Sequence, residues 1–189
     1  MRLVFHKPYP VAPEEDLVEI PKNLTRDSGK IYIAKKSAVQ ALQNLCQQAE
    51  RDDLHIVTIS SHRTFDFQKN YFIEAEKRHG KGKGALWVAP AGFSEHHTGF
   101  VFDLADKDRP ETDDEPVFET TKASDWLKKN ANHFGFELSF PPGNWQGVSY
   151  EPWHWRFAGD EESRKIFHPR LLKAFFVIVK SIICALCRL

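Results

Sequence analysis

The sequence predicts one α+β domain, built on a small, mostly antiparallel sheet with helices packed on one side. With 189 residues, 41% of them hydrophobic and 28% charged, the chain has the size and composition of an ordinary soluble domain. Segments of helical periodicity precede and separate short apolar runs, without the regular alternation that marks a parallel sheet. Three cysteines are too few for a disulfide framework, so a buried core must hold the domain together.

Residues 1–34 are predicted to form an extended arm around that domain. They are rich in proline and include the stretch PYPVAPEEDLVEIPKNLT. After Arg2, three apolar residues precede charge and proline, which is not the pattern of a signal peptide. The chain is therefore expected in the cytoplasm, unless an export signal lies outside this sequence. Basic and acidic residues balance at 26 each, which gives no reason to expect nucleic acid as a partner.

The first half of the domain has the pattern helix, strand, helix. Residues 37–53 carry apolar side chains at helical spacing, with Ser37 as the expected N-cap. Residues 54–61, LHIVTISS, form a short β-branched run that is typical of a buried strand. Helical spacing returns over residues 65–80 and stops at Gly80, a favourable helix end.

The second half is predicted to add three strands and one helix. Strands are expected over residues 98–106, 135–140 and 151–157, and a helix capped by Ser124 is expected before the second of them. The acidic segment 108–116 is interpreted as a solvated surface loop. It lacks the glycine and final glutamate of a calcium-binding loop, which makes a calcium site the less favoured alternative.

The chain ends in an apolar segment, residues 169–189, that is expected to be helical. Lys173 and Lys180 interrupt it, so it falls short of a clean membrane span of about twenty apolar residues. A helix that packs on the domain or lies on a surface is favoured, and membrane association through this segment is the alternative. The expected organisation is thus an arm over 1–34, the domain over 35–168 and this terminal helix.

One buried run contains a carboxylate that needs an explanation. Asp103 lies within FVFDLA, and an isolated carboxylate in a buried strand is costly unless a cation or a metal ion compensates it. His96 and His97 come shortly before it, ahead of the helix-breaking Gly99. A histidine on a loop and an aspartate on the adjoining strand can meet on one metal ion. An ordinary salt bridge to Asp103 is the alternative.

The last predicted strand, EPWHWRF (residues 151–157), supplies further polar groups. Pro152 favours the start of a strand over a helix. Alternation then places His154 and Arg156 on one face and the aromatic residues on the other, against the core. Glu151 reaches the histidine face if the chain bends at the proline. Three ligands beside a free carboxylate are the usual parts of a hydrolytic zinc site, and a packed strand with a surface histidine is the alternative.

Arg63 and Gln68 form a third candidate group. Arg63 directly follows a predicted buried strand and precedes a helix, a position that projects into a cleft, and Gln68 lies near the start of that helix. Arginine is suited to hold a carboxylate or a developing oxyanion. Taken alone the signal is weak, because many arginines in such positions are structural.

Together these three segments resemble a known family. SEHHTGFVFD matches the S-x-H-x-x-G-x-x-x-D pattern of zinc D-alanyl-D-alanine carboxypeptidases of the VanY type. EPWHWR matches their E-x-W-H-x-R pattern, and SSHRTFDFQ is similar to their S-x-Y-R-S-x-x-x-Q segment. The order and approximate spacing of the segments agree as well, over about residues 35–160.

The resemblance implies a small α+β fold with one zinc ion at the sheet surface. By position, the zinc ligands are His96, Asp103 and His154, and this match selects His96 over His97. The remaining implied roles are a catalytic base for Glu151, a place beside the substrate carbonyl for Arg63, and substrate binding for Ser94 and Gln68.

The implied reaction removes the terminal D-Ala from a peptidoglycan stem peptide ending in D-Ala–D-Ala, with water as the nucleophile. The resemblance also implies a location in the cell envelope, although no signal peptide is visible in the sequence. The alternatives are an L,D-carboxypeptidase acting on tetrapeptide stems, a dipeptidase for free D-Ala–D-Ala, an endopeptidase, and a non-hydrolytic zinc module that binds cell wall. Glu151 argues against the last, because a binding module needs no free carboxylate beside its ligands.

Two positions depart from the family pattern. His62 stands where the family usually has tyrosine, and Phe102 stands where it has alanine. We expect the first departure to alter a substrate subsite or to introduce a competing metal ligand, while the zinc ligands themselves are retained.

Overall fold

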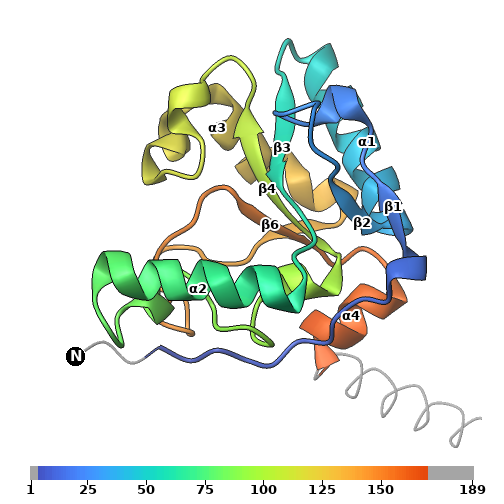
Figure 1. Ribbon diagram of the computed structural model, residues 1–189. Coiled ribbons are helices and arrows are strands. Elements are labelled where there is room, and N and C mark those ends of the chain that lie inside the picture. Colours follow the sequence, from blue (N-terminus) through green and yellow to red (C-terminus); the bar gives the residue numbers. More distant parts are fainter. Residues whose placement is uncertain (1–3, 170–189) are drawn as a thin grey trace, which may run out of the picture.

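The computed structural model describes residues 4–169 and contains a four-stranded sheet with the order β3-β4-β6-β5 (Figure 1). Every neighbouring pair in this sheet is antiparallel, which confirms the predicted α+β class. A separate hairpin, β1-β2, belongs to the N-terminal part. The elements in chain order are β1 (Leu17–Glu19), β2 (Ile33–Lys35), α1 (Lys36–Arg51), β3 (Ile56–Ser60), α2 (Phe65–His79), β4 (Val101–Asp106), α3 (Lys122–Asn130), β5 (Phe136–Leu138), β6 (His154–Phe157) and α4 (Glu161–Phe167).

The apolar core lies between the sheet and helices α1 and α3. Strand β4 contributes Phe102 and Leu104, which are fully buried, and the alternate position Asp103 points the other way. In β6, Trp155 joins the core while His154 occupies the opposite face, as alternation predicted. Helix α2 lies on the side of the sheet that carries these polar residues (Figure 1). One face of the sheet is therefore packed against the apolar core, and the opposite face carries the polar residues of the candidate site.

The N-terminal arm is attached to the segment that carries the two adjacent histidines. The amide of Tyr9 donates to the carbonyl of Gly92 at 3.0 Å, and the amide of Ala12 donates to the carbonyl of His97 at 2.8 Å. Farther along, the amide of Lys35 donates to the carbonyl of Gly99 at 2.8 Å. Two amides of the arm and that of the following Lys35 thus hold both ends of the 92–99 segment.

Both helix caps that were predicted from serine are wrong by a few residues. Helix α1 begins one residue before Ser37, whose hydroxyl donates to Asp160 at 2.6 Å instead. Thr121 caps α3, because its hydroxyl accepts the amide of Ser124 at 3.1 Å. Apolar spacing locates a helix well, but several nearby polar residues can cap it, and tertiary contacts decide which one does.

The predicted apolar helix over 169–189 lies, apart from its first residue, outside the described residues. Within residues 4–169, no helix is long and apolar enough to cross a membrane. Membrane association through the terminal segment stays a prediction from sequence.

Gly99 fixes the turn from the histidine segment into β4, and its replacement is expected to destabilise the protein. Its φ is +71°, and an added Cβ would lie 2.7 Å from Cδ2 of Leu17 and 3.2 Å from Cγ of Lys35. Gly99→Ala should therefore lower the free energy of unfolding by about 1–2 kcal/mol for the left-handed backbone and by about 1–3 kcal/mol more for overpacking. Gly143→Ala, with the same φ and nothing within 4 Å, should show the first cost alone in urea unfolding. Equal losses in the two variants would contradict the packing argument.

Candidate active site

His96, Asp103 and His154 meet at the polar face of the sheet. Each offers one ligand atom, and these atoms all lie within 4.8 Å of one another. Asp103 and His154 are directly paired across β4 and β6, and the 3-10 turn Glu95–Thr98 brings His96 beside them. All three side chains are buried. The structure therefore assembles the three residues that the sequence assigned to zinc.

The hydrogen bonds of this cluster leave ligand atoms free. Nδ1 of His96 lies 2.6 Å from the carbonyl of Ser61, and its Nε2 lies 3.3 Å from Oδ2 of Asp103 without a hydrogen-bond partner. One carboxylate oxygen of Asp103, Oδ1, also lacks a partner and lies 3.2 Å from Nδ1 of His154. Buried polar atoms without partners are costly. Two imidazole nitrogens and a carboxylate oxygen are a donor set that suits zinc, so these residues fit the ion that the sequence predicted.

A buried carboxylate, Glu95, holds the other side of His154. Its Oε2 lies 3.2 Å from Nε2 of the imidazole and accepts the hydroxyl of Ser139 at 2.6 Å. Its Oε1 accepts from Tyr9 at 2.8 Å and from Nη1 of Arg156 at 3.1 Å. Because Nε2 is engaged, Nδ1 is the nitrogen left for a metal. This role of Glu95 was not predicted, although an acidic residue directly before the two histidines in SEHH was a signal for it.

His97, the neighbour of the proposed ligand, has both ring nitrogens in use. Its Nδ1 lies 2.8 Å from the carbonyl of Arg63, and its Nε2 accepts the amide of Gly92 at 3.0 Å. The ring also stacks on Phe65, with centroids 6.1 Å apart. His97 thus joins two loops, and its bonds leave no nitrogen for an ion.

Arg63 forms the salt bridge that was considered as an alternative to metal, and the two arrangements are compatible. Its Nη2 lies 2.7 Å from Oδ2 of Asp103, which leaves Oδ1 of the same carboxylate free. Nε and Nη2 also donate to Ser60 at 3.0 and 2.9 Å, and the guanidinium lies 5.1 Å from the ring centroid of Tyr71. These contacts fix the arginine at the edge of the cluster.

Glu151 is brought beside the cluster by a turn at Pro152. The amide of His154 donates to the carbonyl of Glu151 at 3.2 Å, which closes this turn, and Oε2 of Glu151 lies 3.5 Å from Nδ1 of the imidazole. Burial raises the pKa of the Glu151 carboxyl to about 8, against the opposing effect of the cationic imidazole. A divalent cation among the three ligands would favour the ionised carboxylate.

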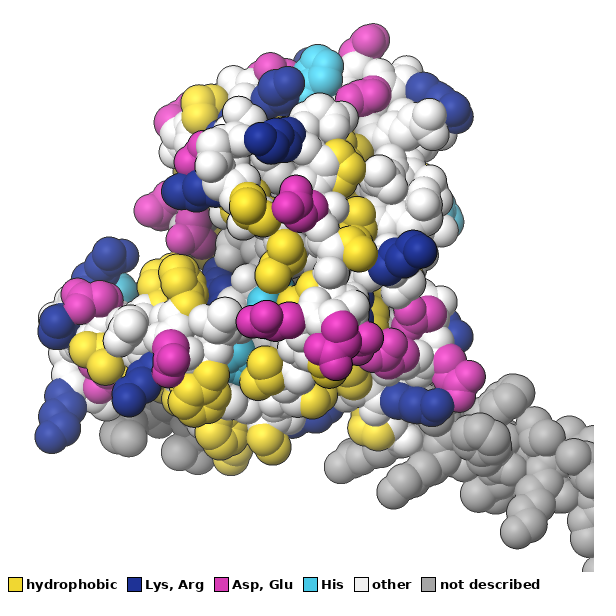
Figure 2. Space-filling view, turned by 45° about the vertical axis from the view of Figure 1, so that its right-hand side comes forward, with side chains coloured by type: hydrophobic (Ala, Val, Ile, Leu, Met, Phe, Trp, Pro, Cys, Tyr) yellow, Lys and Arg dark blue, Asp and Glu magenta, His cyan; other side chains and the backbone are white. Residues whose placement is uncertain are grey.

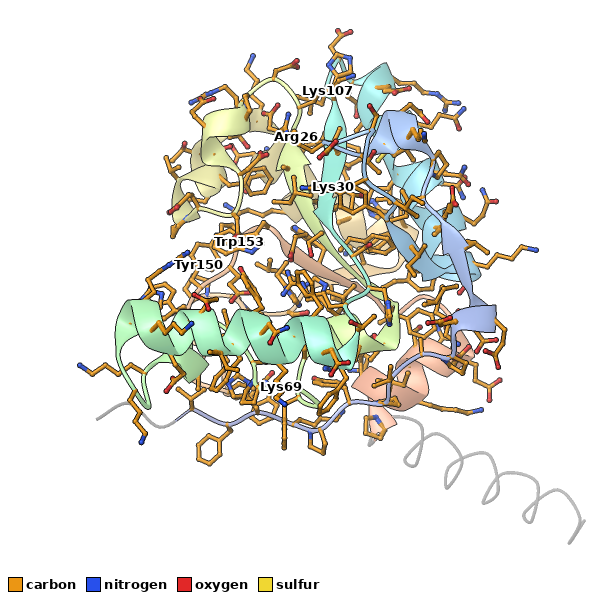
Figure 3. The ribbon with its side chains drawn as sticks, viewed as in Figure 1. Arg26, Lys30, Lys69, Lys107, Tyr150 and Trp153 are labelled. Carbon is orange, nitrogen blue, oxygen red and sulfur yellow. The ribbon has the colours of Figure 1, made fainter. Side chains whose placement is uncertain are left out.

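A cleft of about 430 Å³ opens over the cluster and runs beside α2. Figure 2 shows the hollow between the upper part of the molecule and the part built around α2. In Figure 3, Trp153 lies on the cleft side of α2, whereas Lys69 points away on its other side. Ser94 and Gln68 both line the cleft. The amide nitrogen of Gln68 donates to the carbonyl of Ala89 at 2.8 Å, and its buried oxygen has no partner, so it presents an acceptor.

The acidic segment 108–116 contributes to this cleft, which its interpretation as a solvated loop did not anticipate. Asp114 and Glu115 line the cleft although both are exposed. Arg26 holds the segment in place through two hydrogen bonds to Asp113, at 2.8 and 2.7 Å, and one to the carbonyl of Lys107 at 2.7 Å (Figure 3).

The two departures from the family pattern lie away from the cleft. Phe102 packs in the core, with its ring centroid 5.8 Å from that of Phe136. His62 is not among the residues that line the cleft and does not belong to the three-residue cluster. Within the described residues, the structure therefore shows no direct contact through which His62 would alter a subsite or bind the metal.

Comparisons with known proteins agree with this geometry. A family model described as VanY, D-alanyl-D-alanine carboxypeptidase, matches residues 31–160. The putative carboxypeptidase YodJ of Bacillus subtilis (strain 168) is 31% identical over 157 residues, covering 81% of this chain and 56% of that protein. A D-alanyl-D-alanine carboxypeptidase of Enterococcus faecalis (strain ATCC 700802 / V583) is 32% identical over 141 residues, covering 69% and 50%. The chain thus spans about half the length of the curated relatives it matches.

Solved structures extend the similarity to the fold. The LdcB LD-carboxypeptidase superposes with a TM-score of 0.73 at 29% identity, over 87% of this chain and 78% of the other. A VanY D,D-pentapeptidase from a VanB-type resistance cassette, in complex with Zn(II), superposes with a TM-score of 0.64 at 26% identity, over 88% and 92%.

Proposed function

Because this chain belongs to the VanY family of D-alanyl-D-alanine carboxypeptidases, we propose that it is a zinc-dependent carboxypeptidase that removes the terminal D-Ala of peptidoglycan stem peptides. The observation that best supports the proposal is the buried cluster of two histidines and an aspartate, whose free ligand atoms lie beside the carboxylate of Glu151. The zinc-containing structure of a family relative supports the choice of metal.

In the proposed mechanism, His96, Asp103 and His154 hold one zinc ion, which supplies a Lewis acid that lowers the pKa of water and polarises a carbonyl. Glu151 accepts the proton of the attacking water and later returns it to the amine of the departing D-Ala. Arg63 carries a permanent positive charge at the edge of the cluster and stabilises the negative charge that develops on the carbonyl oxygen.

Their places in the cleft support the proposed substrate-binding roles of Ser94 and Gln68. The free carbonyl oxygen of the Gln68 side chain accepts a hydrogen bond from a peptide N–H of the substrate. Ser94 is buried beside the cluster, and its hydroxyl can both donate and accept. Trp153 closes the wall of the cleft next to Glu151.

A second candidate is an L,D-carboxypeptidase, which removes D-Ala from an L-residue of a tetrapeptide stem. The observation that favours it is the superposition on LdcB, described as an LD-carboxypeptidase, which has a higher TM-score and identity than the superposition on the VanY D,D-pentapeptidase. The curated enterococcal relatives are D-alanyl-D-alanine carboxypeptidases and favour the first candidate.

Release of D-Ala from two synthetic peptides tests the proposal. Zinc-loaded protein is incubated with a pentapeptide ending in D-Ala–D-Ala and, separately, with the tetrapeptide that lacks the last residue. We expect release from the pentapeptide to be the faster, and faster release from the tetrapeptide would establish the L,D activity instead. Release from neither, with zinc bound, would overturn both and favour an endopeptidase or a non-hydrolytic module that binds cell wall.

A further inference from the structure

The cleft continues well beyond the metal cluster, along one face of α2. The helix lines it with side chains that recur at the spacing of successive turns, namely Gln68, Tyr71, Glu74, Ala75, Arg78 and His79. At about 1.5 Å per residue, the distance along the helix from Gln68 to Arg78 is about 15 Å. An extended peptide advances about 3.3 Å per residue, so this length accommodates four to five residues.

The far end of the cleft is built from aromatic and basic side chains. Trp87 stacks on His79, with ring centroids 5.2 Å apart and the planes inclined by 21°, and 44% of the tryptophan is exposed. Arg78 lines the cleft beside them. Its guanidinium makes no hydrogen bond or salt bridge to any residue in the described range 4–169. Helical side chains lean toward the N-terminus of their helix, so Arg78 reaches back toward the metal cluster, and the distance to its guanidinium shortens to about three residues of an extended peptide.

The carboxylates nearest in sequence to Arg78 are already engaged. Glu76 accepts the amides of Gly82 and Gly84, each at 2.5 Å, and Glu74 pairs with Lys77 at 2.7 Å. Basic side chains are gathered over this end of α2, at the left of the lower part of the molecule in Figure 2. The last turn of α2 carries Lys77, Arg78 and His79, and Lys81 and Lys83 follow it in the sequence.

We propose that Arg78, flanked by the stacked Trp87 and His79, forms a subsite for a free carboxylate on the substrate, carried two to three residues before the scissile bond. This inference rests on the proposed carboxypeptidase function, and it specifies the substrate as an acidic peptide rather than a free dipeptide. A carboxypeptidase releases one residue, whose own carboxylate lies within a few ångströms of the bond that is cut. The long arm of the cleft must therefore hold the part of the peptide that precedes this bond.

Chemically, the subsite suits a stem peptide with an acidic second residue. A guanidinium binds a carboxylate through charge-assisted hydrogen bonds and gains much less from a neutral carboxamide. The apolar face of Trp87 offers contact to the aliphatic part of the same residue. Because this contact is distant from the reacting atoms, it should act on substrate binding and leave the chemical step unchanged.

The test compares two pentapeptides, Ala–Glu–Lys–D-Ala–D-Ala and its analogue with glutamine in place of glutamate. Steady-state kinetics on zinc-loaded protein are paired with calorimetric binding to the Glu151→Gln variant, which reports affinity without turnover. We expect the wild type to prefer the glutamate peptide roughly five- to tenfold, in KM and in Kd but not in kcat, the size expected for a partly exposed charge-assisted bond. Arg78→Ala should remove the preference.

Lys69→Ala is the matched control, because it removes a cation of α2 that points away from the cleft (Figure 3) and leaves the pair between Lys77 and Glu74 intact. It should keep the preference. A preference that survives Arg78→Ala, or that falls equally in Lys69→Ala, would overturn the subsite. If neither peptide is cleaved but binding still prefers glutamate through Arg78, the subsite stands and the carboxypeptidase function fails. If the Glu151→Gln variant with Arg78 intact binds both peptides equally well, the subsite is overturned, whether or not the wild type cleaves them.

Discussion

Replacing Glu151 by glutamine is expected to lower kcat/KM by about 10²–10⁴ on whichever stem peptide the protein cleaves, the usual contribution of a general base. This corresponds to about 3–5 kcal/mol of transition-state stabilisation. Glutamine keeps the size and polarity of the side chain but cannot accept the proton of the attacking water. Zinc content should be unchanged, because the free ligand atoms belong to His96, Asp103 and His154. Steady-state kinetics and metal analysis of the same preparation check both statements.

The stability of the zinc-free protein provides a control, because Glu151→Gln is expected to raise stability while it lowers activity. In the folded protein the pKa of Glu151 is raised to about 8, above its value of about 4.5 in the unfolded chain. Between these values the folded state binds the proton and the unfolded state releases it, so the stability of the wild type falls as pH rises through this window. Glu151→Gln lacks this loss and should unfold at higher urea than the wild type near pH 8. A variant that is both inactive and less stable there would indicate a damaged fold rather than a missing base.

The fold and the location of the site follow from patterns that act over short distances. Alternation in EPWHWRF placed His154 away from the core, and the aspartate in an otherwise apolar run identified Asp103. Both inferences use the two-residue period of a strand, which the sequence expresses directly. The contribution of the resemblance was to select His96 from two adjacent histidines. The structure supplies a local reason, because His97 uses both ring nitrogens to join loops.

Contacts between distant segments could not be predicted in this way. The pairing of Asp103 with His154 depends on the register of two strands far apart in the chain. The approach of Tyr9 to Glu95 depends on the path of a proline-rich arm with no periodicity of its own. For the same reason Asp114 was assigned to a solvated loop, because its place in the cleft is set by Arg26 from another part of the chain.

Several of these distant contacts meet at Glu95, and Glu95→Gln is expected to weaken both zinc binding and the stability of the fold. Its carboxylate, 3% exposed, accepts from four donors, which belong to Tyr9, Ser139, His154 and Arg156. An amide offers one acceptor oxygen in place of two and turns an NH₂ group toward these donors. We expect zinc affinity to fall about 10–100-fold, the usual effect of losing the partner that orients a metal-binding histidine. The free energy of unfolding should fall by about 2–3 kcal/mol, as for hydrogen bonds to charged groups.

Glu137→Gln separates the two effects. Glu137 is the other carboxylate partner of Arg156, at 3.2 Å, and makes no hydrogen bond to His154 within residues 4–169. Glu137→Gln should lower the free energy of unfolding and leave zinc affinity unchanged. Competition with a chelator measures the zinc affinity. Equal losses of zinc affinity in both variants would show that Arg156 and the general packing, rather than the Glu95–His154 bond, set the metal site. Loss in Glu95→Gln alone would mean that the orientation of one imidazole is controlled by a carboxylate that the N-terminal arm itself helps to hold.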